Sequence, residues 1–278
     1  MSKMSRQAFE EKVAEAINQY DPAILSYDKE KAEKCRDLYE FIREYAYEKQ
    51  LYNTALSLPI MRGLLDGLYR SRSGFDKNDK IRFTFYEHAL AVCKILIDLH
   101  VPLNTEEEDI LLAGALCHDL MENIDFPDEG RELLDVYHLD RRIYEIVGLI
   151  TRAPSMSESE MKAFCQRIQE NKLAVLVSLA DRGNVVELLY GLTIWDAREY
   201  VYETKAYFLP MCIYAKEHYT EVDMVVNILM EKIRCLIDVT DILSARYQKR
   251  ELALTDEILN LREENARIRG LIAMMQEE

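Results

Sequence analysis

The chain has 278 residues, of which 49% are hydrophobic and only 9 are glycine and 6 proline. This composition predicts an ordered, mostly helical protein and argues against a β-sandwich or a disordered chain. The formal charge of −15, without any block of lysine or arginine, argues against general binding to nucleic acid or to an anionic membrane.

The cysteines and the N-terminal residues indicate the cellular compartment of the protein. The six cysteines never form a Cys-x-x-Cys pair, and most fall within apolar helical patterns. Such cysteines are typical of the reduced core of a cytosolic protein. The polar residues 1–12 do not resemble a signal peptide, and no apolar run is long enough to span a bilayer. We therefore predict a cytoplasmic protein with no membrane partner.

Helical spacing of apolar residues dominates the N-terminal part. It predicts helices over residues 5–19, 30–50 and 56–69. A polar loop follows, and its glycine, serine, asparagine and aspartate mark it as irregular. The loop carries five cations: Arg70, Arg72, Lys77, Lys80 and Arg82. It is either a solvated turn or a clamp for an anion.

Polar residues then coincide with the ends of apolar helices. His88 stands at the head of a predicted helix that reaches residue 99. The apolar run 110–117 leads into His118, Asp119, Glu122 and Asn123, and the run 173–180 leads into Asp181. At helical spacing His118 and Glu122 share one face. Charged groups at the end of a core helix need compensation, and a ligand can supply it.

Four of these residues suit a metal ion: His88, His118, Asp119 and Asp181. Two imidazoles and two carboxylates match one divalent ion with open positions, such as Mn²⁺, Fe²⁺ or Mg²⁺. Structural zinc fits less well, because the chain offers no thiolate pair. We predict one divalent ion as the cofactor, with Mn²⁺ as the first choice. The alternative for His88 is a structural role, which is the commoner role of a single histidine at the head of a helix.

The rest of the chain is also predicted to be helical, over residues 129–137, 140–151, 158–170, 196–218 and from 221 to the end. Near the C-terminus, apolar residues and one asparagine alternate at spacings of four and three, as in a coiled coil. They are Leu254, Ile258, Leu261, Asn265, Ile268, Ile272 and Met275. This pattern indicates a homo-oligomer joined by a short coiled coil. The alternative is a helix packed back on its own domain.

Four blocks between residues 70 and 219 resemble, in order and spacing, the HD superfamily of metal-dependent phosphohydrolases. Within that superfamily they are most similar to the (p)ppGpp hydrolase domain of Rel-type alarmone enzymes. The blocks are Arg72-Ser-Gly74 with Phe85-Tyr-Glu-His88, then Ala113-Gly-Ala-Leu-Cys-His118-Asp119-Leu-Met-Glu122-Asn123, then Leu179-Ala180-Asp181-Arg182-Gly183-Asn184, and Glu203-Thr204 before an apolar helix.

The resemblance implies an all-α HD-domain bundle over residues 61–245. Residues 1–60 would be helices packed on its core, and residues 246–278 a C-terminal amphipathic helix. It further implies that the four metal residues are ligands and that Glu122, with Asn123 beside it, acts in catalysis on a water molecule. The residues implied to contact substrate are Arg70, Arg72, Lys80, Arg82, Arg182, Asn184, Glu203 and Thr204.

The chain departs from the family pattern at three points. Asn123 stands where the family has an acid, Asn184 lies three residues beyond Asp181 rather than four, and the basic loop is longer than usual. The implied function is hydrolysis of a small phosphorylated nucleotide, guanosine tetra- or pentaphosphate at its 3′-pyrophosphate. Two alternatives stay open. One is an HD-fold nucleotide-binding or scaffold protein whose chemistry Asn123 impairs. The other is an HD hydrolase of a different phosphate ester.

Overall fold

The computed structural model of the chain describes residues 5–17, 35–65, 85–123, 138–153, 155–187 and 194–276. All regular structure within these ranges is helical, which confirms the predicted all-α class. The helices of the first half are α1 (Arg6–Ile17), α3 (Arg36–Lys49), α4 (Tyr52–Leu65), α5 (Phe85–Asp98), α6 (Thr105–Cys117) and α7 (Leu120–Asn123). Those of the second half are α9 (Arg141–Ile150), α10 (Glu158–Gln169), α11 (Lys172–Glu187), α12 (Ile194–Glu203), α13 (Leu209–His218) and α14 (Asp223–Gln276), with a π-helix, η2 (Thr204–Phe208), and a 3₁₀ turn, η3 (Thr220–Val222).

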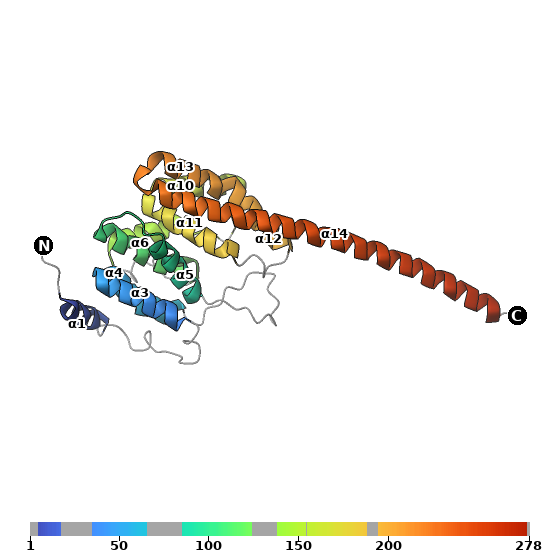
Figure 1. Cartoon of the computed structure of the whole chain (residues 1–278), viewed down its shortest axis with the longest axis horizontal. Coiled ribbons are helices and arrows are strands. Elements are labelled where there is room, and N and C mark those ends of the chain that lie inside the picture. Colours follow the sequence, from blue (N-terminus) through green and yellow to red (C-terminus); the bar gives the residue numbers. More distant parts are fainter. Residues whose placement is uncertain are drawn as a thin grey trace.

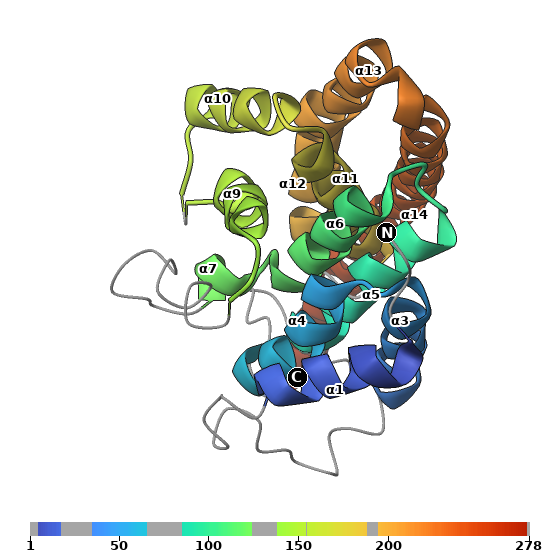
Figure 2. The same cartoon turned by 90° about the vertical axis from the view of Figure 1, so that its left-hand side faces the viewer.

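The helices form a bundle around α5, α6 and α11, which pack against one another. Figures 1 and 2 show α1, α3 and α4 on one side of α5 and α6, and α10 and α13 on the other. The residues of α6 from Asp109 to Cys117 are all buried, because neighbouring helices cover it on every side. A helix that is apolar all round belongs in such a position.

Local signals in the sequence explain where several helices begin. Asn104 caps α6, and its side-chain oxygen accepts the amides of Glu106 and Glu107 at 3.1 and 3.0 Å. Ser157 and Glu160 form a capping box at the start of α10. Both arrangements satisfy backbone amides that have no partner within the helix.

The N-terminal helices join the same core as the rest of the bundle. Phe9 of α1 and Ile42 of α3 belong to one buried cluster that extends to Ile237 of α14. The predicted division of the chain at residues 60 and 245 stays a prediction, and both positions lie inside continuous helices.

The structure differs from the prediction around Asp119 and around Asp181. The sequence predicts that the helix containing residues 110–117 continues through Glu122, but α6 ends at Cys117 and a turn at His118 and Asp119 precedes α7. The Nδ1 atom of His118 donates to the carbonyl of Ala115 at 2.7 Å. The amide of Asp119 would use that carbonyl in a continuous helix. Asp181, in contrast, lies inside α11 rather than at its end.

The predicted helix bounds, the burial of the cysteines and the membrane prediction have different outcomes. The predicted helix 196–218 is interrupted by the π-helix η2, and the predicted helix 56–69 begins earlier, at Tyr52. The predicted helix 129–137 lies outside the described residues. Five cysteines are buried as predicted, whereas Cys235 is exposed on α14. None of the described helices has both the length and the apolar character needed to cross a membrane.

Candidate metal centre

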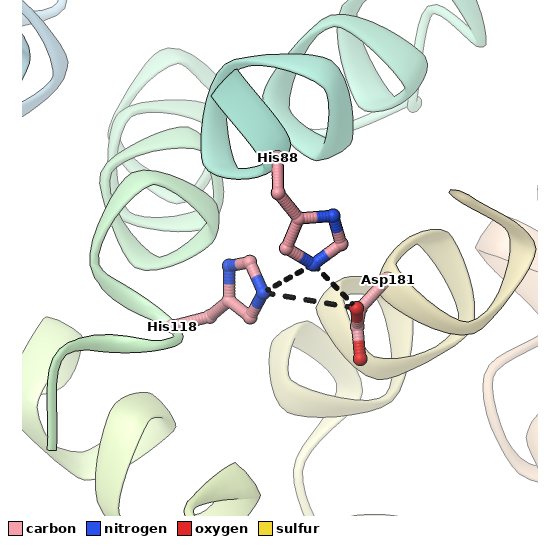
Figure 3. A group of neighbouring side chains, drawn as sticks. All are labelled: His88, His118 and Asp181. Atoms are coloured by element: carbon pink, nitrogen blue, oxygen red, sulfur yellow. Dashed lines mark hydrogen bonds and ion pairs between the residues drawn. The ribbon is translucent and has the colours of Figure 1, made fainter. Parts of the chain in front are cut away.

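Three helical segments bring His88, His118 and Asp181 together. His88 comes from the first turn of α5, His118 from the turn after α6, and Asp181 from the middle of α11 (Figure 3). The Nε2 atom of His88 lies 2.8 Å from Oδ1 of Asp181 and 3.2 Å from Nε2 of His118. The distance from Nε2 of His118 to Oδ1 of Asp181 is 3.8 Å. These candidate ligand atoms all lie within 4.8 Å of one another.

The opposite nitrogen of each imidazole has a defined partner. Nδ1 of His88 lies 2.7 Å from Oδ1 of Asn184, and Nδ1 of His118 lies 2.7 Å from the carbonyl oxygen of Ala115. Because both oxygens are acceptors, each Nδ1 carries the hydrogen. In a neutral imidazole the lone pair is then on Nε2. With both rings neutral, both Nε2 lone pairs would point into the space beside Asp181.

The three side chains that converge here have the chemistry that a metal ion requires. Two nitrogen lone pairs and a carboxylate oxygen repel one another when they are brought together in a largely buried place. His88 and His118 are 3% and 5% exposed, so water screens this repulsion poorly. A cation between the three groups would turn the repulsion into coordination. Nitrogen and carboxylate ligands with fixed ring tautomers are typical of divalent transition-metal sites.

Asp119 lies next to the three residues but outside their tightest group. Its carboxylate oxygens are 3.5 Å from Nε2 of His118 and 3.8 Å from Nε2 of His88. Its side chain is buried, like those of the two histidines. The four residues predicted as ligands are therefore neighbours in space, with Asp119 as the most distant member of the set.

A pocket opens beside this centre, and the space in it, open solvent included, is about 570 Å³. His118, Asp119, Asp181 and Glu122 line its acidic part. Two arginines, Arg152 and Arg182, also line it, together with the apolar and aromatic residues Ile150, Met161, Phe164, Ile168, Tyr200 and Phe208.

Glu203 holds both arginines in place. Arg152 donates to the two carboxylate oxygens of Glu203 at 3.1 and 2.5 Å, and Arg182 donates to one of them at 3.3 Å. The guanidinium of Arg182 also lies 4.0 and 3.8 Å from the ring centres of Tyr200 and Phe208. Counted by themselves, Arg152, Arg182 and Glu203 carry one net positive charge, beside the carboxylates of Asp119, Glu122 and Asp181.

The pKa values of two glutamates reflect these surroundings. Desolvation and, after it, the Asp119 carboxylate raise the pKa of Glu122, although part of its side chain is exposed at the pocket mouth. Burial raises the pKa of Glu203, but hydrogen bonds and charges from Arg152 and Arg182 outweigh it, and the net shift is downward. Glu122 therefore binds a proton more readily than an ordinary glutamate, and Glu203 less readily.

Several predicted substrate residues have other partners in the structure. Asn184 is buried and contacts His88. Thr204 donates to the carbonyl of Tyr200 at 2.6 Å and accepts from Arg182 at 3.5 Å. Glu203 binds the two arginines. Arg70, Arg72, Lys80 and Arg82 of the basic loop lie outside the described residues, as does the side chain of Asn123.

Sequence reasoning missed Arg152. Its backbone amide donates to Glu122 at 2.7 Å, and its guanidinium binds Glu203, so it links two residues that are 81 positions apart in the chain. An arginine in a turn between two helices has no periodic signal of its own. The π-helix η2 was also missed, and such irregular turns are frequent at functional sites.

No protein-family model matches the chain, and no curated protein matches its sequence.

Proposed function

We propose that the chain is a metal-dependent phosphohydrolase that acts on a small phosphorylated nucleotide. One observation carries the proposal: His88, His118 and Asp181 converge beside a pocket that also contains Arg152 and Arg182. Phosphate oxygens bind both metal ions and guanidinium groups. A pocket that offers both suits a phosphate ester better than an uncharged ligand.

The two histidines and Asp181, with Asp119 beside them, would hold one divalent ion, for which Mn²⁺, Fe²⁺ and Mg²⁺ are the candidates. When bound, such an ion polarises a phosphoryl oxygen and makes a water molecule more acidic. The contact from Asn184 to His88 and the contact from the Ala115 carbonyl to His118 keep the ring nitrogens oriented for this role.

Glu122 is the proposed proton acceptor in the reaction. Its carboxyl group lines the pocket, and its raised pKa brings it closer to the pH at which a general base works best. The amide of Arg152 donates to one of its oxygens and limits the positions that the carboxylate can take. Arg152 and Arg182 would bind the phosphate oxygens and stabilise negative charge on the leaving group.

The proposed substrate class comes from the resemblance to the Rel-type hydrolase domain. It makes guanosine 3′,5′-bis(diphosphate), cleaved at the 3′-pyrophosphate, the first nucleotide to test. Ile150, Met161 and Phe164 form an apolar wall of the pocket against which a nucleoside can pack. Other nucleoside phosphates and cyclic nucleotides form the comparison panel.

The experiment measures Mn²⁺ binding by calorimetry and phosphate or pyrophosphate release from the nucleotide panel. We expect His118→Ala and Asp181→Asn to lose both. His218→Ala is the matched control, because His218 is exposed on α13, and it should retain both. A wild-type protein that binds none of Mn²⁺, Fe²⁺ and Mg²⁺ would refute the proposal. Metal and nucleotide binding without turnover would refute the hydrolase and favour a binding protein with impaired chemistry.

A further inference from the structure

The C-terminal part of α14 presents an apolar face that no other described part of the chain covers. Contact with the body reaches Gln248, whose side chain accepts a hydrogen bond from Arg198 at 2.8 Å. Residues 251–269 are all exposed, and Figure 1 shows this part of α14 extending away from the other helices. A single helix in water is only marginally stable, and most helical stability comes from packing an apolar face.

Five of the exposed apolar residues form a seam along one side of this helix. Leu254, Ile258, Leu261, Ile268 and Ile272 are each about half exposed, between 47% and 53%. Together with Asn265 they follow the alternating spacing of four and three that keeps side chains on one face of a supercoiled helix. In heptad notation, Ile258, Asn265 and Ile272 take position a, and Leu254, Leu261 and Ile268 take position d.

We propose that this seam, from Leu254 to Ile272, joins two copies of the chain in a parallel, in-register, two-stranded coiled coil. The residues at the core positions favour two strands. β-Branched isoleucine at a with leucine at d is typical of parallel dimers, and Ile268 is the exception at d. A single asparagine at a, here Asn265, pairs with its counterpart in the second helix and fixes both the register and the number of strands.

The charges beside the seam select the parallel orientation. Glu257 and Glu264 take position g, and Arg262 and Arg269 take position e. In a parallel pair, each g residue faces the e residue five positions later in the other helix. Glu257 then meets the partner's Arg262, and Glu264 meets the partner's Arg269. In an antiparallel pair g faces g and e faces e, so that glutamate would face glutamate and arginine would face arginine.

The continuity of α14 argues against the alternative that the seam packs on its own body. The helix runs without interruption from Asp223 to Gln276. A fold-back would require a break in the helix between Gln248 and the seam, and α14 has none there. A second chain covers the seam without any such change. In the parallel pair both helical bodies lie at the same end of the coiled coil.

The first test is the mass of the full chain in solution, measured by sedimentation equilibrium at micromolar concentration. We expect twice the mass of one chain. Leu261→Lys should reduce it to the mass of one chain. Leu259→Lys is the matched control, because Leu259 is equally exposed, 51% against 53%, but takes position b outside the seam. A monomeric or trimeric wild type, or a dimer that survives Leu261→Lys, would overturn the proposal.

The second test addresses the orientation. Replacing Glu257 and Glu264 by arginine places like charges at every g–e contact of a parallel pair. We expect the dissociation constant of the dimer to rise about tenfold or more, since four attractive contacts become repulsive. Adding Arg262→Glu and Arg269→Glu should restore wild-type affinity. In an antiparallel pair, where g faces g, the same substitutions would replace repulsion between glutamates by repulsion between arginines. The dissociation constant would then stay about the same. An unchanged dissociation constant in the double variant would therefore rule out the parallel arrangement.

Discussion

Asn184 on α11 contacts His88 on α5 across the helical bundle: its Oδ1 atom lies 2.7 Å from Nδ1 of the imidazole. The contact fixes the tautomer of His88 and turns Nε2 toward Asp181, which is 2.8 Å away. Partners of this kind, behind a metal-binding imidazole, set both the orientation and the basicity of the ligand.

Asn184→Leu should therefore weaken Mn²⁺ binding by about 10- to 100-fold, because His88 loses its acceptor and its defined orientation. Asn184→Asp keeps an oxygen at this position and should lose much less. Calorimetric titration with Mn²⁺ measures both effects without reference to any substrate. Asn227→Leu serves as the control, because Asn227 accepts from Lys216 on the surface of α13 and α14. Equal affinities for wild type and Asn184→Leu would show that Asn184 does not support the centre.

The sequence was sufficient to predict the helical fold. Long apolar stripes at helical spacing predicted α3, α5, α6, α9, α10 and α14, since burial of such a stripe is the main determinant of a helix in a folded protein. The π-helix η2 was not predictable in this way. Thr204 and Phe208 within it are buried, and its extra residue per turn shifts the side chains around the helix axis, which a regular helical spacing does not anticipate.

The candidate site was only partly predictable. His88, His118 and Asp181 interrupt apolar runs, and polar residues in such runs indicate a buried role. The partner of Asn184, in contrast, is 96 residues away in the chain, and the amide alone does not reveal whether it faces a histidine or a substrate. Arg152 was missed for the same reason, because its contacts with Glu122 and Glu203 exist only once α7, α9 and α12 have packed.

Glu203 should make the protein sensitive to acid. Its pKa in the folded state is lowered below the ordinary 4.5, because the two arginines outweigh the effect of burial. A carboxyl group with a lowered folded-state pKa stabilises the protein above its unfolded pKa. This contribution disappears as the pH falls through the folded value. At pH 7 we expect Glu203→Gln to reduce the free energy of unfolding by roughly 1–3 kcal/mol.

Urea unfolding at pH 7 and at successively lower pH measures this dependence. The difference between wild type and Glu203→Gln should shrink as the pH falls below 4.5, where the wild-type carboxylate becomes protonated. Glu145→Gln is the control, because Glu145 is 53% exposed in a surface pair with Arg141. It should change stability by less than about 0.5 kcal/mol at any pH. A difference for Glu203→Gln that stays constant with pH would contradict the argument.

Asp109 is expected to be a main determinant of stability between the N-terminal helices and the core. Its carboxylate accepts from the backbone amides of Asn53 and Thr54, at 2.9 and 2.8 Å, and from both of their side chains at 2.8 Å. Asp109→Ala removes the acceptor and leaves buried donors at the start of α4 without a partner. The expected loss is roughly 2–4 kcal/mol in the free energy of unfolding.

Chemical denaturation of the full chain measures this loss. The control is Glu106→Ala, three residues earlier, whose side chain is 71% exposed and pairs with Arg142. It should cost less than about 1 kcal/mol. Similar losses for the two variants would mean that Asp109 does not hold α4 against α6.

Gly183 lies between Arg182 and Asn184, both of which contribute to the site, but its own lack of a side chain has no evident steric purpose. A Cβ atom at this position would come no closer than 3.9 Å to Ile233, which is ordinary van der Waals contact. At Gly114, in contrast, a Cβ atom would lie 3.3 Å from Ile146.

Alanine is favoured over glycine in a helix by about 0.8–1.0 kcal/mol. Gly183→Ala should therefore stabilise the protein by up to about 1 kcal/mol and leave Mn²⁺ affinity unchanged. Gly114→Ala should increase the stability by less, or reduce it, because Ile146 must move. Thermal unfolding and Mn²⁺ titration of the two variants distinguish these outcomes, and a loss of metal affinity in Gly183→Ala would mean that α11 must adjust its backbone around Asp181 to hold the ion.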